Sequence, residues 1–217
     1  MLRLTIGNCN YSSWSMRPWL VLNHFDIEFE LNRLPLDTPR FAAEIGDLSP
    51  TRCVPVLQDD ALTVWDSLAI IEYVGDRFDI PVWPDDIPTR ASARAVSAEM
   101  HAGFGHLRHD LPMNLRGRGR PARLTAETRA DISRVCEIWE TCLEESGGPF
   151  LFGAFCAADA MFAPVVGRFV TYGIDAACPD YMHAVSTFGA YRNWADMAAR
   201  ETERLPHTDA FLVPGEG

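Results

Sequence analysis

Three serines lie close together in the segment Tyr11-Ser12-Ser13-Trp14-Ser15. An alternating apolar stretch precedes this segment and a helical apolar pattern follows it, so the serines fall between a strand and the start of a helix. The first N–H groups of a helix lack intrahelical partners and therefore favour an anion. One serine would serve as a helix N-cap, and three exceed that need. We therefore expect Ser12, Ser13 or Ser15 to stabilise a bound anion.

Two residue pairs further along the chain could bind the rest of a ligand. Pro55 opens a predicted strand and has no N–H to give to a sheet. A cis Val54–Pro55 bond would leave the N–H and C=O of Val54 free for an extended peptide. Asp66 and Ser67 lie between a strand and a helix, where the hydroxyl suits a carboxylate and the aspartate suits an ammonium. The plainer alternatives are an edge-strand proline and a simple capping pair.

Short strands and helices must position these residues. Leu2, Leu4 and Ile6 alternate with polar neighbours, which predicts an opening strand. Similar patterns and turn signals predict further elements in the order β-α-β-α-β-β-α. After the opening strand these elements cover residues 15–25, 28–34, 41–45, 54–57, 62–65 and 67–78.

The pattern changes after residue 80. Prolines and charged residues without periodicity fill the segment 81–90, which predicts a linker between a first domain of residues 1–80 and a second domain of residues 91–217. The second domain is predicted to be all-α, because apolar residues recur there at helical spacing. One long helix is indicated by Val96, Met100, Phe104, Leu107 and Leu111, another begins after Thr125 as N-cap, and two more cover residues 157–172 and 180–200.

Composition excludes several classes of function. The net charge of −11 argues against general nucleic-acid binding, and the absence of lysine excludes lysine chemistry. Arg116, Arg118, Arg120 and Arg123 form one basic cluster, for which a solvated loop is favoured over an anion site. No run of 18 apolar residues and no secretory signal pattern occur, so no membrane span and a cytoplasmic location are expected. The cysteines lack C-x-x-C and Cys/His spacing, so no metal is predicted.

Taken together, these motifs resemble those of the cytosolic glutathione transferases over essentially the whole chain. That family combines a thioredoxin-like domain with a helical one, and has a hydroxyl loop after the first strand, a Val-Pro motif and an acid-Ser pair. The loop from Ser12 to Arg17 is similar to the S-S-C-S-x-R loop of the zeta class, with Ser12 on the catalytic serine. Trp14 stands where that class has cysteine, so its isomerase chemistry on maleyl compounds stays open here.

The resemblance implies a role for each motif. The Ser12 hydroxyl would donate to the sulfur of glutathione, the co-substrate, and the backbone of Val54 would pair with its cysteinyl part. Asp66 and Ser67 would hold the γ-glutamyl amine and carboxylate. Arg52 lies near the place where the family often has lysine beside the glycine carboxylate, and it either substitutes for that lysine or is solvated. The family also implies a homodimer.

The electrophile would bind between the domains. Phe104 lies on an apolar stripe and could equally be a core residue, and a pair of arginines facing inward would favour an anionic substrate. The candidates for this pocket are Trp14, His101, Phe104, Arg108, Met113, Arg168 and Tyr172.

The expected function is glutathione transfer to a small electrophile. One alternative is a glutathione-dependent thiol–disulfide reductase that uses Cys9, although a bystander role is favoured for this thiol. The other alternative is a non-catalytic binding protein that keeps the fold.

Overall fold

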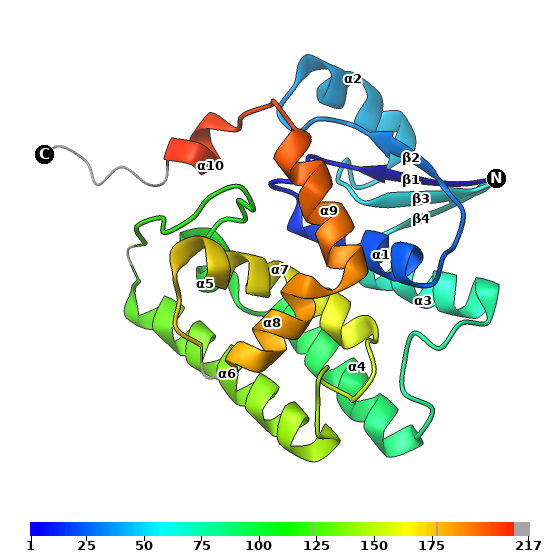
Figure 1. The fold of residues 1–217 in the computed structure, drawn as a ribbon. Coiled ribbons are helices and arrows are strands. Elements are labelled where there is room, and N and C mark those ends of the chain that lie inside the picture. Colours follow the sequence, from blue (N-terminus) through cyan, green and yellow to red (C-terminus); the bar gives the residue numbers. More distant parts are fainter. Residues whose placement is uncertain (123, 177, 211–217) are drawn as a thin grey trace, which may run out of the picture.

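A four-stranded sheet forms the first part of the molecule (Figure 1). The computed structural model describes residues 1–122, 124–176 and 178–210. Strand β1 (Leu2–Ile6) pairs in parallel with β2 (Glu30–Arg33) and antiparallel with β3 (Val56–Asp59). A hairpin joins β3 to β4 (Leu62–Trp65), which gives the order β2-β1-β3-β4.

Helices cover both faces of this sheet. Figure 1 shows α2 (Pro39–Leu48) on one face, with α1 (Ser13–His24) and α3 (Ser67–Phe78) on the other. Pro39 begins α2, where a first turn tolerates proline because its N–H groups have no intrahelical acceptor, whereas Pro18 lies inside α1, past its first turn. The predicted β-α-β-α-β-β-α order is confirmed.

Helices make up most of the rest of the described chain. Figure 1 shows them packed below and beside the sheet, with α9 crossing α1. The only pairings of β type among the described residues after β4 are isolated bridges within residues 150–154. This confirms the predicted fold class. The helices are α4 (Ile87–Ala102), α5 (Gly105–Asp110), α6 (Ala126–Ser146), α7 (Ala157–Tyr172), α8 (Pro179–Thr187), α9 (Gly189–Arg200) and α10 (Pro206–Ala210).

Two predicted helices are each divided into two. The periodic stripe from Val96 to Leu111 is interrupted because Phe104 adopts a left-handed backbone with φ of 59°, which ends α4 and starts α5. Flanking Gly103 and Gly105 favour this break, since glycine lowers helix propensity on both sides. The stretch 180–200 breaks at Phe188, whose extended backbone separates α8 from α9.

The linker ends earlier in the sequence than predicted. Helix α4 begins at Ile87, because the Asp86 carboxylate accepts the N–H of Thr89 at 3.0 Å and caps the helix. Pro88 falls in the first turn, where it does not interrupt the helix. The connection between α3 and α4 therefore covers residues 79–86, and the division into two domains stays a prediction.

The core joins the sheet to the helices through α1 and α7. Helix α1 packs on α3, α7 and α9, and almost every side chain of α7 is buried. Trp19 of α1 and Trp194 of α9 have ring centroids 5.3 Å apart. Because α1 is held from both sides, its N-terminus has a fixed place between the sheet and the helices.

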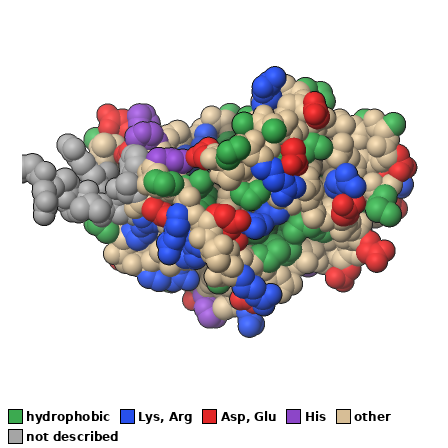
Figure 2. Space-filling model, turned by 90° about the horizontal axis from the view of Figure 1, so that it is seen from above, with side chains coloured by type: hydrophobic (Ala, Val, Ile, Leu, Met, Phe, Trp, Pro, Cys, Tyr) green, Lys and Arg blue, Asp and Glu red, His purple; other side chains and the backbone are tan. Residues whose placement is uncertain are grey.

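The surface carries mixed charges. On the face drawn in Figure 2, acidic and basic side chains alternate around small apolar patches rather than forming one large field of a single sign. Within the described ranges, no helix has the length and apolar character needed to cross a bilayer.

Candidate functional site

The turn between β1 and α1 holds its serine hydroxyls in a short hydrogen-bonded chain. Ser12 is the N-cap of α1, and its Oγ lies 2.7 Å from Ser15 Oγ and 3.4 Å from Ser15 N. Ser15 is fully buried, and its Oγ accepts the N–H of Gly7 at 3.1 Å. Ser13 Oγ instead accepts from Arg168 at 3.2 Å. Of the three serines, Ser12 is therefore the one at the cap position, next to the first N–H groups of the helix.

A cavity of about 420 Å³ opens beside the first turn of α1, where Trp14 lines it, and the three serines are not among its lining residues. It brings together five residues predicted from sequence, since Trp14, Val54, Pro55, Asp66 and Ser67 all line it, and the Val54–Pro55 bond is cis. The sequence did not assign three further lining residues to the site, namely Thr51, Trp65 and Cys53, whose thiol is exposed.

Asp66 serves the fold and the cavity together. Its Oδ1 accepts the N–H groups of Leu68 and Ala69 at 2.9 and 3.2 Å, which caps α3. Its Oδ2 lies 3.0 Å from Nε2 of His101, a residue of α4, so the helical part of the chain reaches the wall of the cavity. Asp66 also has φ of 76°, which turns the chain sharply from β4 into the helix.

Three arginines gather behind the cavity. Arg17 is 2% exposed, its Nη1 lies 3.5 Å from Ser67 Oγ, and its Nε has no hydrogen-bond partner. Its guanidinium carbon lies 4.2 Å from the Trp14 ring centroid, and that of Arg108 lies 5.3 Å from the same ring. Arg168 is also buried and donates to the carbonyls of α7 and of the segment after α5, besides Ser13.

The electrostatics of these arginines are unusual. Burial, together with the neighbouring charges of Arg168 and Arg108, lowers the pKa of Arg17 to about 9, and the charge of Asp66 opposes this shift. Burial and the Arg108 charge lower the pKa of Arg168 to about 10, and burial lowers that of Arg108. Within the described part of the chain, no carboxylate lies within ion-pair distance of any of the three. The carboxylates of Asp66 and Asp131 act on Arg17 and Arg108 only from beyond ion-pair distance, so the cluster keeps an excess of positive charge, which favours an anion.

Other predicted pocket residues lie in the packing around the site. Phe104 and Met113 are both buried in the core, as the alternative interpretation of Phe104 proposed. The Tyr172 hydroxyl donates to the carbonyl of Pro112 at 2.8 Å, and burial raises its pKa. Arg52 is exposed and lies against Gly46 of α2, outside the residues that line the cavity.

Cys9 is unsuited to thiol chemistry. Its side chain is 1% exposed, and burial together with the nearby carboxylate of Glu201 raises its pKa far above the ordinary value. Because the thiolate is the reactive form, this environment keeps the thiol inert. The structure therefore does not favour the reductase alternative.

Arg17 is the most important residue that the sequence did not assign to the site. An arginine on the apolar pattern of the helix that follows the serines was the available signal. A charged side chain that points into the core needs polar groups around it. The guanidinium of Arg17 has such a group in Ser67, a residue of the cavity wall. Among the described residues, no group of His, Cys, Asp and Glu could hold a metal.

Comparison with known proteins gives the class. Residues 11–77 match the family model "Glutathione S-transferase, N-terminal domain". The chain is 29% identical over 166 residues to a maleylacetoacetate isomerase of Rattus norvegicus, covering 75% of this chain and 76% of the relative. It is 23% identical over 166 residues to glutathione S-transferase L1 of Arabidopsis thaliana, covering 73% and 63%.

Solved structures share the fold. A glutathione transferase homolog from Burkholderia with bound glutathione superposes with a TM-score of 0.72 at 23% identity, covering 92% of this chain and 99% of that one. A bacterial maleyl pyruvate isomerase of the zeta class gives 0.71 at 21% identity, covering 93% and 100%. Residues 11–77 thus carry the glutathione S-transferase N-terminal domain, and the chain has the glutathione transferase fold, with a thioredoxin-like sheet followed by a helical second part.

Proposed function

We propose that this protein is a glutathione transferase that adds the glutathione thiolate to a small electrophile bearing a carboxylate. The observation that carries the choice of electrophile is the cluster of Arg17, Arg108 and Arg168, which has no carboxylate within ion-pair distance among the described residues. The cavity beside the serine turn is the site proposed for glutathione itself.

The hydroxyl chain supports a role for Ser12 in ionising the thiol. When the sulfur is bound, Ser12 can turn its proton toward it while Ser15 donates to Ser12 and Gly7 N–H donates to Ser15. Lowering a thiol pKa from about 8.5 to about 6.5 requires about 2.7 kcal/mol. A hydrogen bond to a charged group contributes about 1.5–3 kcal/mol, and the helix N-terminus adds about 0.3–1 kcal/mol. These two effects suffice, and no separate base is needed.

The peptide part of glutathione fits the cavity walls. Its cysteinyl backbone can pair with the N–H and C=O of Val54, which the chain leaves at the cavity edge before β3 begins. Its ammonium can approach Asp66 Oδ2, the oxygen that faces His101 rather than the α3 cap. Its γ-glutamyl carboxylate can meet Ser67 and the N-terminus of α3, with Arg17 behind.

The electrophile then lies on the side of Trp14 that faces Arg108. Arg108 is the least buried of the three arginines. Its Nη1 donates to the carbonyl of Met100, and the other N–H groups of its guanidinium can donate to a carboxylate. Attack of the thiolate on an electrophilic carbon forms the C–S bond, and the electron pair passes to the leaving group or to the conjugated acceptor.

A matched pair of substrates tests this choice. We would compare 4-chloro-3-nitrobenzoate with its neutral carboxamide, using the wild type and Arg108→Gln. We expect Arg108→Gln to lower kcat/KM for the carboxylate about 10–100-fold, since an ion pair to a desolvated carboxylate is lost, and to change the amide little. Equal rate enhancements over the uncatalysed reaction with glutathione for both substrates in the wild type would refute the anionic electrophile. A cis-olefinic dicarboxylate in the same assay reports isomerase activity.

We also propose a homodimer that acts in the cytoplasm in detoxification. Strand β4 is an edge strand on which Leu62 and Trp65 are 47% and 45% exposed, and this supports an interface there. Sedimentation velocity would distinguish one copy from two.

The proposed division at residues 81–90 is testable by limited proteolysis, which would cut the connection between α3 and α4 first.

A further inference from the structure

The turn that precedes Ser12 is bound on every side by the helical part of the chain. Cys9 N and Asn10 N donate to the Glu201 carboxylate at 2.6 and 3.0 Å. Cys9 O accepts from Trp194 Nε1 at 2.9 Å, and Asn10 O accepts from Leu115 N at 3.3 Å. All four backbone polar groups of these two residues therefore have partners far away in the sequence.

The side chain of Asn10 extends the same pattern. Its Nδ2 donates to Asn114 Oδ1 at 2.9 Å, and its Oδ1 accepts the N–H of Arg116 at 2.8 Å. Within the turn itself, Asn8 O accepts the N–H groups of Ser12 and Tyr11 at 2.8 and 3.2 Å. The position of Ser12 thus follows from a turn in which the backbone groups of Cys9 and Asn10 are all held by the second part of the chain.

Glu201 is the central partner in this arrangement. It is 9% exposed, and each carboxylate oxygen accepts one N–H of the turn. Oε1 also accepts from Arg33 Nη1 of β2 at 3.1 Å, so the buried carboxylate has an opposite charge beside it. A carboxylate is buried at low cost only when its oxygens are paired in this way, and removing it would leave two N–H groups without acceptors.

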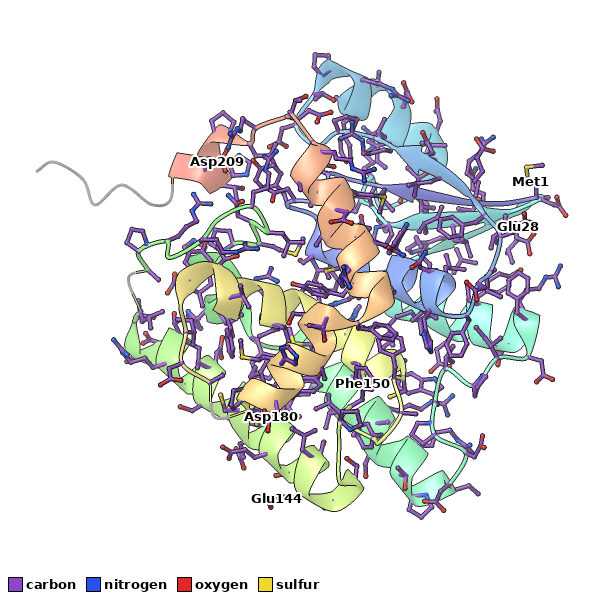
Figure 3. All side chains as sticks on the ribbon, viewed as in Figure 1. Met1, Glu28, Glu144, Phe150, Asp180 and Asp209 are labelled. Carbon is purple, nitrogen blue, oxygen red and sulfur yellow. The ribbon has the colours of Figure 1, made fainter. Side chains whose placement is uncertain are left out.

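Hydrogen bonds also hold the segment that carries Glu201 in place. The Arg116 guanidinium binds the carbonyls of Glu201 and Glu203, and Asp209 of α10 accepts from Tyr11 Oη and Asn114 Nδ2 at 3.0 and 2.9 Å. Figure 3 marks Asp209 at the end of this segment, beside the loop that follows α5.

This arrangement corrects the sequence interpretation of the basic cluster as a solvated loop. Arg116 is partly buried and clamps the segment after α9, and Arg120 Nη2 donates to the carbonyl of Asp209 at 2.7 Å. Arg118 is exposed, whereas Arg123 lies outside the described residues.

We propose that Glu201 is a positioning residue, which fixes the Cys9–Asn10 backbone and thereby sets where the Ser12 hydroxyl meets the glutathione sulfur. This rests on the proposed function of Ser12. A hydrogen bond to a sulfur anion depends strongly on distance and angle, so a small shift of the turn weakens it. The role of Glu201 is thus expressed in the chemistry of the thiol as well as in stability.

Glu201→Gln and Glu203→Gln form a matched test. Both side chains pair with Arg33, at 3.1 and 2.7 Å, and only Glu201 also contacts the turn. The ultraviolet absorbance of the bound thiolate is titrated against pH in the full-length chain. We expect Glu201→Gln to raise the apparent pKa of bound glutathione by about one unit and to lower kcat/KM about 10–100-fold. Glu203→Gln should match the wild type in both.

Two further variants keep the test decisive if Glu201→Gln does not fold. Glu201→Asp keeps the charge and shortens the reach by one methylene, and Trp194→Phe removes the bond to Cys9 O. Both should raise the thiol pKa while circular dichroism shows a folded protein. A lowered unfolding midpoint with an unchanged thiol pKa would mean a purely structural role and would overturn the proposal.

The outcome for the wild type separates the two claims. If its bound glutathione titrates with a lowered pKa that Glu201→Gln does not change, only the role of Glu201 fails. If wild-type glutathione titrates like the free thiol, the proposed function fails, and the role of Glu201 fails with it because no activated sulfur remains to be positioned.

Discussion

Replacing Ser12 with alanine tests the central step most directly. The hydroxyl lies at the N-cap of α1, and its hydrogen-bond partners in the structure are the N–H and hydroxyl of Ser15. Its loss removes one donor to the bound sulfur, which is worth about 1.5–3 kcal/mol, or about one to two pKa units. The variant should also lose about 1 kcal/mol of stability, because a cap is removed.

The kinetic consequence follows from the fraction ionised. If the pKa of the bound thiol rises from about 6.5 to about 8, the thiolate fraction at pH 7 falls about eightfold, and kcat/KM should fall at least as much. Activity should recover as the pH approaches 8, since the sulfur then ionises without help. The measurement is the ultraviolet absorbance of the thiolate against pH, together with the pH–rate profile.

The neighbouring serines are the controls for this experiment. Ser13→Ala removes an acceptor for Arg168 and should leave the pKa of the bound thiol nearly unchanged. Ser15→Ala removes the partner of Ser12 and the acceptor of Gly7 N–H, so it should raise the pKa by less than Ser12→Ala does. An unchanged pKa in Ser12→Ala, or a rise confined to Ser13→Ala, would refute the reasoning.

Two further predictions concern stability. Burial among aromatic rings lowers the pKa of His24 in the folded protein below its value of about 6.5 in the unfolded chain. The unfolded chain therefore binds more protons as the pH falls. The contribution of His24 to folding stability is complete above about pH 6.5 and is lost below that pH. Urea unfolding of the wild type and His24→Phe at pH 7.5 and 5.5 should therefore show a difference that grows on acidification; a constant difference would contradict it. Asp159→Ala should cost about 3 kcal/mol, because the buried carboxylate accepts the N–H groups of Leu151 and Cys156, which would be left unpaired. A urea-derived loss below about 1 kcal/mol would exclude that role.

The sequence determined what local rules control. Alternation and helical spacing set the order of strands and helices, and the Asp-Ser pair marked the start of α3 at Ser67, as the structure has it. The serine segment fell at the N-terminus of α1, because capping depends on residues within one helical turn. Even the break at Phe104 had a local signal in its flanking glycines, although the apolar stripe concealed it.

Only the tertiary structure brought the distant partners together. Arg17, Arg108 and Arg168 come from α1, α5 and α7, and nothing in their local patterns places the first two against one tryptophan with the charge of Arg168 nearby. Glu201 reaches Cys9 across 192 residues of sequence. Periodicity and capping report interactions within a few residues along the chain, whereas these contacts depend on how whole helices pack. The sequence therefore located the hydroxyl, and the packing of the second half of the chain decided what surrounds it.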